Sequence, residues 1–155
     1  MGVVMGQAPE QGARDGDLVT VFVYGSLLKG FWNHRLFASR LVACEPARVE
    51  GLRLAHLPEG YPAAFDGEPA QVVVGELHTF AQGRRALTAL DELEEFDPRR
   101  PAASVYVRRR VRASVEGGSA EAWIYVYAWE GWEEALRRGA GEVASGDWRG
   151  FMARQ

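Results

Sequence analysis

Cysteine, lysine and long hydrophobic runs are all scarce in this sequence of 155 residues. Cys44 is the only cysteine, which excludes an internal disulfide and a zinc site made of several thiolates, and which favours a reducing, cytoplasmic location. No segment approaches the roughly 18 consecutive apolar residues that a membrane-spanning helix requires. We therefore expect a soluble protein that has no membrane partner.

An excess of positive charge is missing as well, because 18 basic residues face 21 acidic ones and give a net charge of -3. Proteins that neutralise a run of phosphates usually carry a basic patch, so we expect no nucleic-acid partner. The sequence contains no glycine-rich nucleotide loop of the GxGxxG type and no HExxH motif. Its three histidines, His34, His56 and His78, lack the short spacing of metal ligands on one helix. These absences predict a protein without a metal or another cofactor.

The sequence does contain enough apolar material for one folded domain, since 47% of its residues are hydrophobic and 25% are charged. Residues 1–16 carry scattered glycines and no apolar periodicity, which predicts a disordered N-terminal tail. Residues 17–155 are then expected to form a single domain.

Short β-branched and aromatic runs, separated by segments rich in glycine and proline, predict five strands. They are Leu18–Tyr24, Val49–Leu57, Val72–Phe80, Val105–Val115 and Ala122–Trp129. A glycine-rich segment at 116–121 predicts a hairpin that makes the last two strands antiparallel neighbours. Helices are expected at about Trp32–Ala38, Arg84–Glu95 and Glu133–Arg138. The pattern predicts an α+β fold on a mostly antiparallel sheet, which can close into a small barrel.

The helix expected at Arg84–Glu95 carries four acidic residues, whose directions follow from a rotation of about 100° per residue. On this wheel Glu94 lies between Leu87 and Leu90, on the apolar side. Expected off the apolar stripe, and in contact with water, are Asp91, Glu92 and Glu95. A carboxyl group that faces the core has a raised pKa and can act as a general base near neutral pH. The alternative is that Glu94, in the last turn, points to water or pairs with an arginine.

A possible substrate cradle follows the first predicted strand, at Tyr24, Gly25, Ser26 and Leu27. Backbone N–H groups that are freed at a strand end can bind a carboxylate or an oxyanion, and glycine permits close approach of a ligand. An ordinary turn between a strand and a loop is the alternative interpretation.

In the predicted strand Val105–Val115, Tyr106 shares one face with Arg108, Arg110 and Arg112. We expect this face to be solvated. The alternative is that Tyr106 or an arginine turns into a pocket, where it binds a substrate carboxylate.

Several short motifs occur in order along the chain. They are Val21–Leu27 (VFVYGSL), Tyr61–Ala63 (YPA), Val74–Leu77 (VGEL), Leu90–Glu94 (LDELE), Tyr106–Arg108 (YVR), Ala122–Tyr127 and Ser145–Trp148 (SGDW). Together they resemble the γ-glutamylcyclotransferase-like superfamily, in the branch of small avirulence-induced proteins and γ-glutamylamine cyclotransferases. The resemblance implies a small mixed, mostly antiparallel β-barrel with peripheral helices.

The resemblance also implies an enzyme that acts on a small-molecule γ-glutamyl substrate without a metal or cofactor. In the implied reaction, the α-amine of the γ-glutamyl group attacks its own γ-amide carbonyl, which forms 5-oxoproline and releases the amine. The catalytic carboxylate is assigned by resemblance to Glu94, and substrate binding to Tyr24, Gly25, Ser26 and Leu27.

Three positions depart from the pattern of that superfamily. Glu95 stands where the family usually has glycine, and Phe96 stands where it usually has tyrosine. Leu27 follows YGS in place of the asparagine typical of the glutathione-pathway branch. These departures keep a second function open, namely a non-catalytic barrel that binds a small molecule or a partner. Release of 5-oxoproline from γ-glutamyl amines distinguishes the two.

Deleting residues 1–16 should leave thermal stability nearly unchanged, because this segment has no apolar periodicity to bury. Thermal melts of the truncated and full-length chains test this expectation. A loss of several degrees in Tm would show that the segment packs on the domain.

Overall fold

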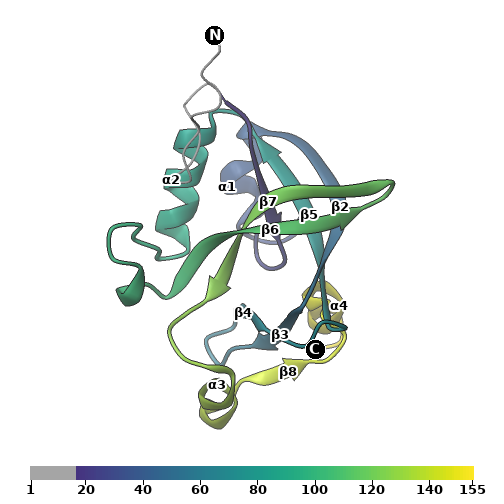
Figure 1. The fold of residues 1–155 in the computed structure, drawn as a ribbon, viewed down its shortest axis with the longest axis vertical. Coiled ribbons are helices and arrows are strands. Elements are labelled where there is room, and N and C mark those ends of the chain that lie inside the picture. Colours follow the sequence, from purple (N-terminus) through teal and green to yellow (C-terminus); the bar gives the residue numbers. More distant parts are fainter. Residues whose placement is uncertain (1–16) are drawn as a thin grey trace.

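The computed structural model describes residues 17–155, which form two β-sheets surrounded by short helices (Figure 1). The segment for which we predicted a disordered tail, residues 1–16, lies outside the described residues. The first sheet is a closed barrel with strand order β1-β5-β2-β6-β7, and the second has the order β4-β3-β8. The predicted α+β barrel with peripheral helices is confirmed.

The barrel consists of β1 (Val19–Val23), β2 (Leu41–Glu50), β5 (Val72–Phe80), β6 (Tyr106–Val115) and β7 (Gly118–Tyr127). The smaller sheet consists of β3 (Leu52–His56), β4 (Pro62–Asp66) and β8 (Gly141–Val143). The α-helices are α1 (His34–Phe37), α2 (Gly83–Leu93), α3 (Trp132–Arg138) and α4 (Trp148–Ala153). Two 3-10 turns complete the described elements, η2 (Ala38–Arg40) and η3 (Pro101–Ala103).

Antiparallel pairing dominates the barrel, as the sequence predicts. The predicted hairpin joins β6 to β7, with Val115 opposite Gly118. A single parallel contact, between Val21 of β1 and Trp123 of β7, closes the barrel. Closure leaves the barrel without a free edge that could pair with another chain.

The structure differs from the prediction mainly between residues 41 and 66. The predicted strand Val49–Leu57 is in fact two strands, because Gly51 has a φ of +83° and turns the chain from the barrel into the smaller sheet. Strand β2 begins well before the predicted run. We did not predict this first part because its exposed positions 42–46 lack the apolar pattern that identifies the other strands. The segment at 58–69 lies between two predicted strands, and we expected it to be a connection without strands. It contains β4. The short elements β8 and α4 were not predicted.

The SGDW motif at Ser145–Trp148 joins the two sheets near the C-terminus. A Cβ atom on Gly146 would lie 1.9 Å from the carbonyl oxygen of Val72, so only glycine fits against β5. Trp148 is completely buried, and its Nε1 donates a hydrogen bond to Nδ1 of His56 at 3.0 Å. This motif therefore has a structural role in holding α4 against β3 and β5.

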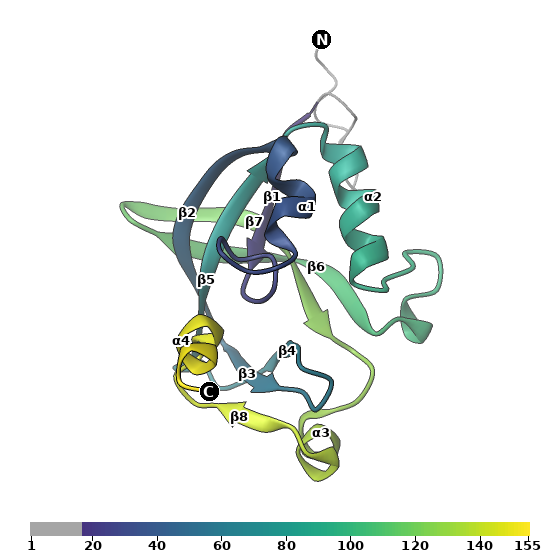
Figure 2. The same ribbon diagram turned by 180° about the vertical axis from the view of Figure 1, so that it is seen from behind.

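Helix α2 lies beside the barrel, away from the smaller sheet (Figure 2). Its apolar stripe is buried as predicted, including Leu87 and Leu90. The expectation that Asp91 contacts water is wrong, because Asp91 is only 7% exposed. No helix within residues 17–155 is long and apolar enough to cross a membrane.

Candidate active site

A pocket of about 620 Å³ opens between the barrel and the β3–β4 connection. All six residues that the sequence singled out line this pocket, namely Tyr24, Gly25, Ser26, Leu27, Glu94 and Tyr106. They come from three separate parts of the chain, so the fold brings together side chains that lie up to 82 positions apart, from Tyr24 to Tyr106. The pocket is therefore the candidate active site.

Glu94 is the residue that ends helix α2, and its side chain reaches the pocket. Its N–H donates to the carbonyl oxygen of Leu90 at 2.9 Å, so its position is fixed by the last turn of the helix. Burial, with a further contribution from the charge of Glu95, raises the pKa of Glu94 to about 7. Within residues 17–155 no group donates a hydrogen bond to its carboxyl oxygens. Glu94 is therefore able to accept a proton from a bound molecule near neutral pH.

The turn after Glu94 explains why glycine is common there in the resembling family. Glu95 has a φ of +56°, a left-handed conformation that residues with a Cβ adopt at a cost. Its N–H bonds to the carbonyl of Glu92 at 3.2 Å, and the N–H of Phe96 bonds to the carbonyl of Asp91 at 2.8 Å. This is the Schellman arrangement that ends many helices. The departure at Glu95 is thus accommodated without a change in the turn.

Asp91 anchors the same helix to the barrel. Its Oδ1 accepts hydrogen bonds from Nε of Arg108 at 2.9 Å and from the hydroxyl of Tyr125 at 2.6 Å, and its Oδ2 accepts from Nη2 of Arg108 at 3.2 Å. Arg108 is buried between this carboxylate and the ring of Trp123, 4.5 Å from its centroid. The expected solvation of this face of β6 is therefore wrong for Arg108 and also for the buried Tyr106, although it holds for Arg110 and Arg112.

The loop from Tyr24 to Leu27 presents free backbone donors to the pocket. The N–H groups of Gly25, Ser26 and Leu27 donate to no other group within residues 17–155. Asn33 fixes the loop, because its N–H bonds to the Ser26 carbonyl at 3.0 Å and its Nδ2 bonds to Ser26 Oγ at 2.8 Å. Such a group of donors suits a carboxylate or a developing oxyanion.

Gly25 has a packing role in addition to the close approach that we expected. A Cβ atom on Gly25 would lie 2.5 Å from Cγ of Pro62, the first residue of β4. The loop and the smaller sheet therefore fit together only because residue 25 has no side chain.

The hydroxyl groups of Tyr24 and Tyr106 form hydrogen bonds with other groups of the protein. Tyr24 donates to the carbonyl of Tyr125 at 2.6 Å and accepts from the N–H of Ala64 at 3.3 Å. Tyr106 donates to the carbonyl of Pro62 at 2.8 Å. Burial, and to a smaller extent the nearby Glu94, raises the pKa of both hydroxyls above the usual range. Both tyrosines thus connect the barrel to β4, and a direct role of Tyr106 in substrate binding stays a prediction.

The sequence did not predict a second set of contacts, which Glu76 and Arg149 make with the backbone of Lys29, just after the loop. Glu76 Oε1 accepts from the N–H of Lys29 at 3.1 Å, while Nη2 of Arg149 donates to the Lys29 carbonyl at 2.5 Å and to Glu76 Oε2 at 3.1 Å. Burial alone would raise the pKa of Glu76, but the bonds from His78, Lys29 and Arg149 lower it to about 2. Glu76 and Arg149 therefore fix both backbone groups of Lys29, two residues after the loop.

The exposed Cys44, the half-buried Glu76 and the buried His78 lie close together, with ligand atoms within 4.8 Å of one another. The fold thus gathers side chains that could hold a metal, which the spacing in the sequence does not show. Arg149 already pairs with the Glu76 carboxylate, and its positive charge opposes the binding of a cation. The absence of a metal stays a prediction.

The barrel and its pocket define a class of small α+β proteins, with the half-buried carboxyl group of Glu94 in the pocket. The family model described as "Gamma-glutamyl cyclotransferase, AIG2-like" matches residues 21–150. The chain belongs to this family, which confirms the resemblance seen in its motifs.

Individual relatives support the same assignment. The chain is 29% identical over 107 residues to the gamma-L-glutamyl-butirosin B gamma-glutamyl cyclotransferase of Niallia circulans, a match that covers 69% of this chain and 65% of the relative. An AIG2-like protein from Mus musculus has the same fold, with a TM-score of 0.62 and 24% identity over 77% of this chain and 82% of that protein. YkqA from Bacillus subtilis also has the same fold, with a TM-score of 0.62 and 24% identity. The match covers 86% of this chain but only 40% of YkqA.

Replacing Asp91 by alanine should lower the free energy of unfolding by about 3–5 kcal/mol, because Arg108 would be left buried without its partner. Urea denaturation measures the change. Glu92→Ala, on the exposed side of the same helix, serves as the control and should have an effect within about 0.5 kcal/mol. Equal effects of the two changes would mean that Asp91 does not anchor the helix.

Glu95→Gly should stabilise the protein by about 1 kcal/mol, since glycine adopts the left-handed conformation without the steric cost. It should also lower the pKa of Glu94, because a neighbouring negative charge is removed. Glu95→Gln separates the two effects: it should lower the pKa of Glu94 without the gain in stability. Denaturation curves and the pH dependence of turnover provide the measurements, and an unchanged stability of Glu95→Gly would contradict the assignment of strain.

Proposed function

We propose that this protein is a γ-glutamylcyclotransferase that converts a γ-glutamyl amide into 5-oxoproline and a free amine, with Glu94 as the general base. The observation that carries the proposal is the carboxyl of Glu94, which lies in the pocket without a hydrogen-bond partner among the described residues and has a pKa of about 7. Such a pKa suits a group that must take up and return a proton at neutral pH.

The reaction moves two protons from the α-nitrogen of the substrate to the leaving amine. The α-ammonium group of the substrate loses a proton to Glu94, and its nitrogen then attacks the γ-amide carbonyl carbon. The C–N bond to the leaving amine breaks as that amine receives the proton held by Glu94. The ring nitrogen then loses its second proton, which passes through Glu94 to the released amine, so that 5-oxoproline and an ammonium ion are formed. Nucleophile and electrophile belong to one molecule, so the protein mainly has to hold the reactive conformation, and we infer that no metal or cofactor is required.

The free N–H groups of Gly25, Ser26 and Leu27 have two uses in this scheme. They can bind the α-carboxylate of the γ-glutamyl group, and they can stabilise negative charge that develops on the carbonyl oxygen. Their presence in the same pocket as the half-buried carboxyl of Glu94 favours an enzyme over a non-catalytic barrel. The name of the Niallia circulans relative, which gives a γ-glutamyl compound as its substrate, favours it too. A cytoplasmic location, suggested by the single exposed cysteine, stays a prediction.

Glu94→Gln should reduce turnover by about 10²-fold or more, the usual range for loss of a general base, and should leave the fold intact. Release of 5-oxoproline from a panel of γ-glutamyl amines measures the activity. Glu92→Gln changes an exposed acid on the same helix and should alter the rate only slightly. If Glu94→Gln kept its activity, or if the wild-type protein released no 5-oxoproline from any amide, the proposed function would be refuted.

Stability should depend on pH through the same carboxyl. Its pKa is about 7 in the folded protein against the ordinary value of 4.5, so the folded state binds more protons between these values and loses stability as the pH rises through them. Glu94→Gln removes this loss. The free energy of unfolding of the variant, relative to wild type, should therefore increase by about 2–3 kcal/mol between pH 4.5 and pH 8. Urea denaturation at both pH values tests this, and a constant difference would show that Glu94 is not desolvated.

A further inference from the structure

We propose that the mouth of the pocket selects γ-glutamyl amides whose released amine carries a second positive charge, as the monoamides of diamines and polyamines do. This substrate class rests on the proposed cyclotransferase function and narrows it. Three features of the mouth carry the inference: an excess of carboxylates, an arginine that is already engaged, and a rim of exposed aromatic side chains.

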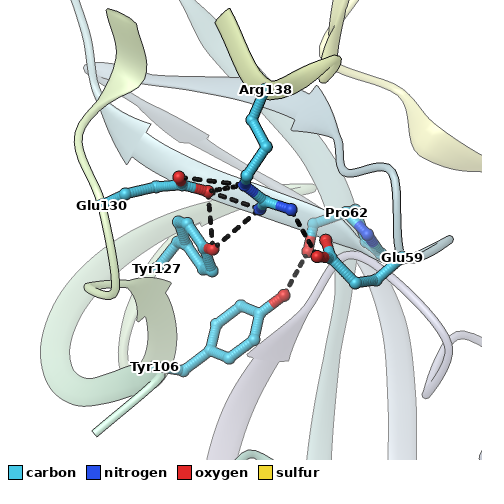
Figure 3. A network of polar contacts seen from close by, with 6 residues as sticks. All are labelled: Glu59, Pro62, Tyr106, Tyr127, Glu130 and Arg138. Atoms are coloured by element: carbon cyan, nitrogen blue, oxygen red, sulfur yellow. Dashed lines mark hydrogen bonds and ion pairs between the residues drawn. The ribbon is translucent and has the colours of Figure 1, made fainter. Parts of the chain in front are cut away.

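The arginine at the mouth is Arg138, which reaches down from α3 between two carboxylates (Figure 3). Its Nε donates to both oxygens of Glu130 at 3.0 Å, and its Nη1 pairs with Glu59 from the β3–β4 connection. Its Nη2 donates to Glu130 and, at 3.3 Å, to the hydroxyl of Tyr127. Each nitrogen of the guanidinium thus has a partner in the protein, which leaves Arg138 poorly suited to bind an anionic substrate group.

Negative charge remains after this pairing. Among residues 17–155, the pocket is lined by four carboxylates, from Glu59, Glu94, Glu95 and Glu130, and by one basic residue, Arg138. Hydrogen bonds from Arg138 lower the pKa of both Glu59 and Glu130, so these two are charged at neutral pH. The side chain of Glu59 is 50% exposed and can be reached from the solvent. Even with Glu94 protonated, the pocket therefore attracts a cation and repels an anion.

Exposed aromatic side chains also line this pocket. Trp32 and Tyr61 are each 48% exposed and Trp129 is 63% exposed, and all three line the pocket. An ammonium group is attracted to the face of an aromatic ring, and most strongly to that of tryptophan. Aromatic faces next to carboxylates are the usual surroundings of a bound organic cation. An amine product with a carboxylate would find no unengaged basic side chain among the lining residues that the structure describes.

Three γ-glutamyl amides of nearly equal size test the proposal. They are the monoamide of 1,4-diaminobutane, which is cationic, the amide of 1-aminopentane, which is neutral, and the amide of 4-aminobutanoic acid, which is anionic. We expect kcat/KM, measured by release of 5-oxoproline, to be about tenfold higher for the cationic than for the neutral amide, and lowest for the anionic one. The preference should shrink as salt is raised to about 0.5 M, because exposed charges are screened.

Variants locate the preference at the mouth. Glu59→Gln removes one charge and should reduce the ratio of cationic to neutral kcat/KM by about threefold, and Trp129→Leu should reduce it as well. Glu134→Gln is the matched control: this acid lies on the exposed surface of α3, is paired with Arg137, and does not line the pocket. The control should leave the ratio unchanged.

The outcomes separate this inference from the proposed function. Equal kcat/KM for the three amides, or a preference for the anionic one, would overturn the inference and leave the cyclotransferase in place. If none of the amides gave 5-oxoproline, the proposed function would fail, and calorimetric binding of the same three amides to the wild-type protein would still decide the selectivity. Tightest binding of the cationic amide supports a cation-selective mouth, and equal affinities refute it.

Discussion

The buried contact of Asp91 with Arg108 and Tyr125 is the constraint on which the site depends. Arg108 and Tyr125 face each other across the β6–β7 ladder, so the barrel presents its two donors together. Their bonds to Asp91 fix the last turn of α2, and Glu94 follows three residues later at the end of that helix. Because a buried ion pair tolerates little displacement, this contact determines where the candidate base lies in the pocket.

The pocket itself results from the way in which the smaller sheet packs on the barrel. Hydroxyl bonds from Tyr24 and Tyr106 hold β4 against β1 and β6, and Gly25 allows Pro62 to approach the loop closely. Behind the loop, Glu76 and Arg149 fix the backbone of Lys29. The donors of the loop and the carboxyl of Glu94 are thus held in one pocket by separate contacts, which is the preorganisation that an intramolecular reaction requires.

The partial burial of Glu94 links function to stability. The same desolvation that raises its pKa to about 7 makes the charged form unfavourable in the folded protein, so the property that suits a general base also destabilises the fold above neutral pH. Glu95 contributes in both ways, since its charge adds to the pKa shift and its backbone adopts a left-handed conformation. Strain and unfavourable charge gather at the one turn that carries the candidate base.

The sequence by itself determined the barrel strands other than β2, the hairpin and the buried stripe of α2. It also singled out Glu94 as the candidate general base. All of these follow from local periodicity and from short motifs. Only the tertiary structure decided that Asp91 is buried, that β4 forms within a connection, and that Arg138 joins Glu59 to Glu130. A helical wheel relates an acid to its own helix, but it contains no information about donors that arrive from other strands. Arg108 lies 17 positions and Tyr125 lies 34 positions from Asp91, and contacts over such distances exist only once the barrel has closed.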